Sequence, residues 1–102
     1  MLNLLSIMVK LDKITLVKLD KYFFVSKSAF DKASKAINKS HKSEASIILD
    51  MSNRYISDAD FFKKNNDFVN AFAALNYAHG WLDTGSKLGF FDVDDSNLFV
   101  IK

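Results

Sequence analysis

The feature that most constrains this chain is a shortage of residues that interrupt helices. Its 102 residues include no proline and only three glycines. Folds built from many short strands place both residues at their turns, whereas long helices exclude proline and are weakened by glycine. The hydrophobic fraction of 49% is typical of a globular protein. We therefore predict an all-α fold that forms a single domain over residues 1–102.

Three stretches of the chain have helical periodicity. Apolar residues recur every three or four positions from about residue 10 to 39, from 44 to 64 and from 67 to 88. In the third stretch the apolar residues cover more than half of the circumference. This breadth predicts a central helix that contacts both of the others or a second subunit. The sequence thus predicts a three-helix bundle.

The breaks between these stretches contain capping residues. Ser43 is expected to cap the second helix, and Asp67 the third, after a left-handed turn at Asn66. Gly89 is expected to end the third helix. Gly80 lies inside that helix, where glycine costs about 1 kcal/mol, so we expect another backbone to approach it closely.

The two ends of the chain differ from the helical part. Residues 90–93 and 98–101 are short β-prone runs around a turn signal, which predicts a C-terminal tail over 90–102 that is either extended or a β-hairpin. Residues 1–9 are apolar but much shorter than the roughly 20 residues of a membrane helix, and no basic segment precedes them. We expect a flexible extension there and a cytoplasmic protein without membrane association.

Charge is unevenly distributed although the net charge is only +2. Residues 1–42 hold nine lysines and three aspartates (+6), and residues 43–102 hold five basic and nine acidic residues (−4). The two halves are expected to attract each other within the fold or between copies. Lysines at helical spacing form a candidate basic face: Lys18, Lys21, Lys32, Lys35 and Lys39. It lacks arginine and interleaved aromatics, so nucleic-acid binding is not the favoured interpretation.

One candidate polar site lies in the third stretch. Asp83 follows His79 by four residues and could orient its imidazole as a general base, with Tyr77 close in sequence. We favour a packed histidine, because no nucleophile motif accompanies it, and we predict no catalytic residue. The chain has no cysteine, no calcium-loop pattern and no glycine-rich phosphate loop. No metal site and no cofactor are therefore predicted.

The number of aromatic residues is large for three short helices. Ten phenylalanines, three tyrosines and one tryptophan exceed what one small core is expected to cover, and aromatic residues are enriched where subunits meet. The strand-like tail adds an unpaired edge. We expect a homodimer; the alternative is a monomer whose tail folds back over the surplus aromatics.

The run Tyr77-Ala78-His79-Gly80-Trp81-Leu82-Asp83 and the stretch 58–72 resemble an archaeal family of small helical-bundle proteins, domain of unknown function 357. The resemblance covers roughly residues 20–102. It implies an archaeal three-helix bundle and no activity. This family usually has Gly-Asp-Tyr at the helix break, where this chain has Asn66-Asp67-Phe68.

The order of elements also resembles helical domains that pair with small nucleotidyltransferases. The nuclease members of that class carry an arginine followed within about six residues by a histidine, a signature that Arg54 lacks here. Two functional hypotheses follow. The favoured one is a non-enzymatic protein-protein interaction or self-association module. The alternative is a nucleic-acid or nucleotide-binding accessory protein, a partner of a nucleotidyltransferase.

Overall fold

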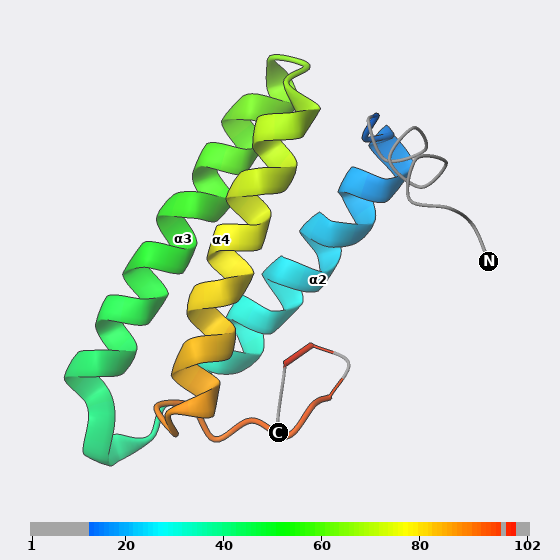
Figure 1. Cartoon of the computed structure of the whole chain (residues 1–102). Helices are drawn as coiled ribbons and strands as arrows, with labels where there is room; N and C mark the ends of the chain where they lie inside the picture. The colour runs from blue at the N-terminus through cyan, green and yellow to red at the C-terminus, as the bar shows by residue number, and fades with distance from the viewer. Residues whose placement is uncertain (1–12, 97, 100–102) are drawn as a thin grey trace, which may run out of the picture.

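A computed structural model of the protein describes residues 13–96, 98 and 99. Three helices, α2 (Leu16–Ser34), α3 (Lys42–Lys64) and α4 (Phe68–Lys87), form the structure, with a short 3₁₀ helix η1 (Lys39–His41) between α2 and α3 (Figure 1). Over these residues no strand is formed, and the predicted all-α three-helix bundle is confirmed. The extension expected over residues 1–9 lies outside the described residues.

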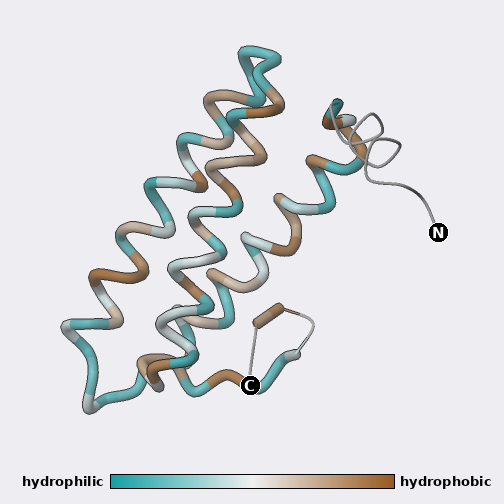
Figure 2. The backbone as a smooth tube through the Cα atoms, in the orientation of Figure 1, coloured by the Kyte–Doolittle hydropathy of each residue, from teal (hydrophilic) through white to brown (hydrophobic). Residues whose placement is uncertain are grey.

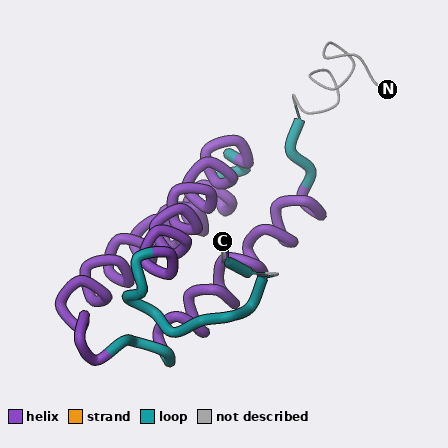
Figure 3. Tube along the Cα trace, turned by 60° about the horizontal axis from the view of Figure 1, so that its bottom comes forward, coloured by secondary structure: helices purple, strands orange, loops and turns teal. Residues whose placement is uncertain are grey.

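Helix α4 lies at the centre of the bundle. It runs antiparallel to α3 and packs along it, while α2 crosses both at an angle (Figures 1 and 3). The predicted central position of the third helix is therefore confirmed. The molecule is only 16 Å thick along its shortest principal axis. Of the helices in the described part, none is long and apolar enough to cross a membrane.

The turn between α3 and α4 follows the sequence signals. Asn66 takes the left-handed conformation (φ 59°), and the Asp67 side chain accepts a hydrogen bond from the backbone N–H of Asn70 at 3.2 Å. Gly89, also left-handed (φ 81°), follows the end of α4. These capping predictions are confirmed. The prediction that Ser43 caps α3 is wrong. The helix begins at Lys42, so His41 is the N-cap residue and Ser43 lies inside the helix.

Helix α2 ends five residues before the predicted boundary. Its last residue is Ser34, whereas the periodicity placed the end near Lys39. The backbone of residues 36–38 bonds to the C-terminal tail instead of continuing the helix. Asp92 N–H donates to the Ala36 carbonyl at 2.8 Å, and Asn38 N–H donates to the Phe90 carbonyl at 2.9 Å. The helical ladder and this pairing compete for the same backbone groups, and the pairing prevails.

The tail is extended where it meets residues 36–38, with one antiparallel bridge between Ile37 and Phe91. The extended form of the prediction holds there, and no β-hairpin occurs among the described residues. Leu98 and Phe99 enter a turn, because both of their backbone N–H groups donate to the Asp95 carbonyl. The ring of Phe91 lies against Gly85, where an added Cβ would come within 2.6 Å of it.

Apolar and polar residues alternate along each helix (Figure 2). The buried residues form two core clusters. The hairpin-end cluster, near the α3–α4 turn, comes from helices alone: Leu19, Phe23, Ala59, Ala71, Ala74 and Leu75. The tail-end cluster combines helix residues with Phe91 and Phe99 of the tail: Ala29, Ala33, Ala45, Ile48, Leu82, Phe91 and Phe99. Phe91 and Phe99 are thus buried, as the monomer alternative expected.

Candidate functional site

Two predicted polar residues meet on the side of α4 that faces α2. His79 Nε2 lies 3.7 Å from Asp83 Oδ1, and both side chains are largely buried. The other ring nitrogen of His79, Nδ1, is buried and has no hydrogen-bond partner among the described residues. A separation of 3.7 Å is longer than a hydrogen bond, so the contact orients the ring only weakly.

A cavity of about 280 Å³ adjoins this pair between α2 and α4. Its walls include Tyr22 and Ser26 from α2 as well as Asn76 from α4. Tyr77, the third residue of the predicted polar site, lies elsewhere. Its ring stacks on Tyr55 of α3 at 5.4 Å between centroids, because residues two apart on a helix point to different sides.

The chemistry available at this cavity is limited. Ser26 is buried in the helix packing, and no hydrogen bond from its hydroxyl to His79 is present in the described residues. Across residues 13–96, 98 and 99, no three His, Asp or Glu side chains gather closely enough to hold a metal ion. His79 is largely buried, as a packed histidine is expected to be, but no partner satisfies its Nδ1 among the described residues. The polar site stays a prediction.

The predicted basic face is divided by the structure. Lys32 pairs with Asp95 of the tail at 2.5 Å, and Lys35 with Asp31 at 3.1 Å. Lys18 lies over the ring of Phe72. Lys39 belongs to η1, so it does not continue the face of α2. For Lys21 no ion pair occurs in the described part of the chain.

The two charged halves of the chain attract each other within the fold. Besides the Lys32 pair, Lys27 of α2 lies 3.7 Å from Asp60 of α3. The pair between Lys63 of α3 and Asp20 of α2, at 2.7 Å, has the opposite sense, because its lysine belongs to the acidic half and its aspartate to the basic half. These pairs are exposed, so each contributes at most about 1 kcal/mol. Ion pairs within one chain therefore help to hold α2 on α3. The uneven charge does not by itself require a second copy of the chain.

The outward face of α4 is a feature that the sequence reading did not single out. Between residues 69 and 84 the exposed residues there are uncharged: Val69, Asn70, Asn76, Tyr77, Gly80 and Thr84. Lys87, the last residue of α4, is exposed and charged. The only charged residue between positions 68 and 86 is Asp83, which lies beside the α2 cavity. Tyr77 and Val69 are 64% and 61% exposed. A run without charge on an exposed helix was the signal that could have identified this face.

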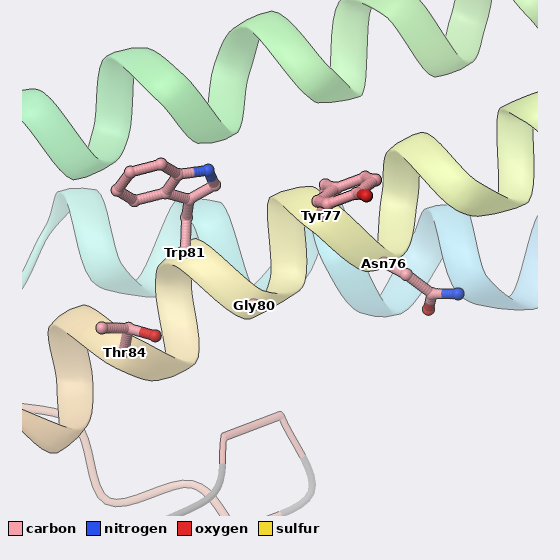
Figure 4. A pocket seen from close by; sticks show the side chains of 5 residues that line it. All are labelled: Asn76, Tyr77, Gly80, Trp81 and Thr84. Carbon is pink, nitrogen blue, oxygen red and sulfur yellow. The ribbon is translucent and has the colours of Figure 1, made fainter.

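Gly80 leaves a hollow in the middle of this face. The hollow has a volume of about 420 Å³ and is lined by Asn76, Tyr77, Gly80, Trp81 and Thr84. Figure 4 shows Tyr77 and Trp81 rising from one side of α4 and Asn76 from the other, with bare backbone at Gly80 between them. A Cβ added at Gly80 would meet nothing within 4 Å. The expected close approach at Gly80 is therefore wrong within this chain, and Gly85 has that role instead.

Comparison with known proteins identifies the family. The curated proteins give no match to this chain, and the solved structures give none either. The model of one family, described as a protein of unknown function (DUF357), matches residues 21–91, which include α3, α4 and most of α2. With well over half of its length matched, the chain belongs to the DUF357 family.

Proposed function

We propose that this protein is a non-enzymatic interaction module that associates with itself as a homodimer. The observation that carries the proposal is the exposed outward face of α4, whose exposed residues between positions 69 and 84 are uncharged. A helix face in contact with water normally carries charged residues, as the outer faces of α2 and α3 do. Two large hydrophobic residues on this face, Val69 and Tyr77, are exposed.

The excess of aromatic residues is a weaker argument for a dimer once the structure is known. Phe91 and Phe99 are buried in the tail-end cluster, so a second copy is not needed to cover them. Phe24 and Phe61 stay 72% and 64% exposed, but they lie among charged residues of α2 and α3. The face of α4 is therefore the stronger support for association.

Sedimentation equilibrium from micromolar to submillimolar concentration tests the proposal. The average mass is expected to rise with concentration from the monomer value of 11.6 kDa toward twice that value. A mass that stays at the monomer value over the whole range would contradict self-association. The measurement needs no ligand, and it uses the full chain.

The accessory-protein hypothesis is the weaker alternative. Its support is the set of lysines on α2, and two of these, Lys32 and Lys35, already pair with carboxylates. A gel shift with mixed RNA and DNA at low salt distinguishes it from the first hypothesis. A cytoplasmic location and an archaeal source, both expected from the sequence, stay predictions.

A further inference from the structure

We infer that two copies of the protein pair through α4 in antiparallel orientation, with Tyr77 of each copy seated in the Gly80 hollow of the other. This inference rests on the proposed self-association and adds the surface, the orientation and the register. It commits to a second copy of this chain as the occupant of the α4 face.

The first step of the argument is that one helix carries both a hole and a matching knob. Gly80 interrupts the side chains of the outward face and leaves a hollow of about 420 Å³. Tyr77, almost one turn away, is 64% exposed although its ring stacks on Tyr55 of the same chain. In a two-fold pair, if residue 77 contacts residue 80 of the partner, then residue 80 contacts residue 77 of the partner. Both holes are then filled by one set of contacts.

The second step is the register that this contact imposes. Antiparallel α4 helices with residue 77 opposite residue 80 also place Ala73 opposite Thr84 and Val69 opposite Leu88. Ala73 and Thr84 are small, which lets the helices approach closely at those points. Val69 and Leu88 are large hydrophobic residues that are exposed, at 61% and 59%. The register covers each of them with the other.

The third step is charge. A partner surface for an uncharged face must itself be uncharged, because an unpaired charge is costly to bury. The outward face of α4 satisfies this condition against itself between residues 69 and 84, and its one exposed charged residue, Lys87, lies near the end of the strip. An acidic or basic partner gains nothing from it. Antiparallel pairing also opposes the two helix dipoles, so neither end meets an end of the same sign.

The size of the contact sets its expected strength. The strip from residue 69 to residue 88 is about 28 Å long and about 10 Å wide, which gives roughly 300 Å² per copy. The side chains of Tyr55 and Trp81 border the strip and add to it. This is well below the roughly 800 Å² per partner of a standard interface, so we expect a weak, transient dimer that forms at the high end of the concentration range.

Three variants test the surface by sedimentation equilibrium. Tyr77→Ser removes the knob and Gly80→Leu fills the hole, and each is expected to weaken the dimer about 30-fold or more. Gly80→Leu keeps the fold, because the space at Gly80 is open and leucine favours a helix more than glycine does. Phe24→Ser, at an equally exposed aromatic on α2, is the control and is expected to leave association unchanged. Circular dichroism confirms that each variant is folded.

Disulfide cross-linking tests the register, since the chain has no cysteine of its own. An Ala73→Cys chain mixed with a Thr84→Cys chain is expected to form the mixed dimer on oxidation. Either variant alone is expected to cross-link poorly, because identical positions lie about 16 Å apart in this register. Ser57→Cys, on the exposed side of α3, serves as the matched control.

The outcomes separate this inference from the proposed function. A monomeric wild type overturns both. A wild-type dimer that Tyr77→Ser and Gly80→Leu leave intact, or that Phe24→Ser disrupts, overturns the α4 surface while self-association stands. Efficient cross-linking of Ala73→Cys with itself indicates parallel helices and overturns the antiparallel register.

Discussion

The two ends of the bundle bury their apolar residues by different means. At the hairpin end, α2, α3 and α4 supply every buried residue of the cluster, and the turn at Asn66 fixes how α3 meets α4. At the tail end, α2 stops at Ser34, and a non-helical segment completes the core with Phe91 and Phe99. The hairpin end depends on contacts between helices. The tail end also depends on backbone hydrogen bonds between the tail and residues 36–38, which lie more than 50 positions apart in the sequence.

The difference explains where the aromatic residues go. Three helices in a layer only 16 Å thick bury few large side chains, and most buried positions of α4 are alanine, leucine or glycine. At the tail end, the large side chains of Phe91 and Phe99 fill the space beside the small residues Ala29, Ala33 and Gly85. The outward face of α4 stays exposed at both ends of the bundle, and its exposed residues between positions 69 and 84 are uncharged.

Phe91→Ala is the substitution expected to disturb this arrangement most. Phe91 is 2% exposed and fills the space above Gly85, so truncating it removes buried area and leaves a cavity. We expect a loss of about 3–5 kcal/mol in the free energy of unfolding, measured with urea. Phe24→Ala, at a 72% exposed ring, should change stability by no more than about 0.5 kcal/mol.

A small loss for Phe91→Ala would mean that the tail is not an integral part of the core. Hydrogen exchange at the amides of Asn38 and Asp92 provides a separate readout. Both amides donate to the opposite segment, so both should lose protection in Phe91→Ala while amides at the hairpin end keep it.

Two glycines of α4 make a matched pair for the next prediction. Gly85→Ala places a Cβ 2.6 Å from the Phe91 ring, and the overpacking should cost about 1–3 kcal/mol. Gly80→Ala places a Cβ in open space, and its higher helix propensity should stabilise the monomer by up to about 1 kcal/mol. Both are measured by urea unfolding at a concentration where sedimentation shows a monomer. Changes of the same sign would contradict the distinction between a packed and an open glycine.

Much of the hairpin end could be predicted from the sequence, because its determinants are local. Periodicity located α3 and α4 to within two residues, and Asn66 and Asp67 act as their residue types predict. The end of α2 could not be predicted in the same way. Residues 36–38 continue a helical pattern, and only the tail, far along the chain, supplies the competing hydrogen bonds.

The candidate site shows the same limit. The four-residue spacing of His79 and Asp83 correctly placed them on one side of α4, but it could not show that Tyr77 points away to stack on Tyr55. Glycine at position 80 lowers helix stability, which predicts a close packing contact there. The structure has open space at Gly80 instead. Whether a small residue receives a partner from its own chain or leaves a hollow is a tertiary property.

The smallest expected effect is a pH dependence where η1 joins α3, at the tail end. The hydrogen bond between His41 Nδ1 and Glu44 Oε2, at 3.0 Å, lowers the pKa of the Glu44 carboxyl below its ordinary value of 4.5. A pKa lowered by folding means that the carboxylate stabilises the fold at pH values above the unfolded-state pKa. That contribution is lost as the pH falls through the folded-state pKa.

Glu44→Gln should therefore lower the melting temperature slightly at neutral pH, and the difference from wild type should disappear in acid. Ser43→Ala is the control: a serine that capped α3 would contribute about 1 kcal/mol, but His41 occupies the cap position and Ser43 lies inside the helix. Its melting temperature should match wild type at both pH values. If Ser43→Ala lowered stability and Glu44→Gln did not, the start of α3 would follow the local capping rule, and this junction would resemble the hairpin end rather than differ from it.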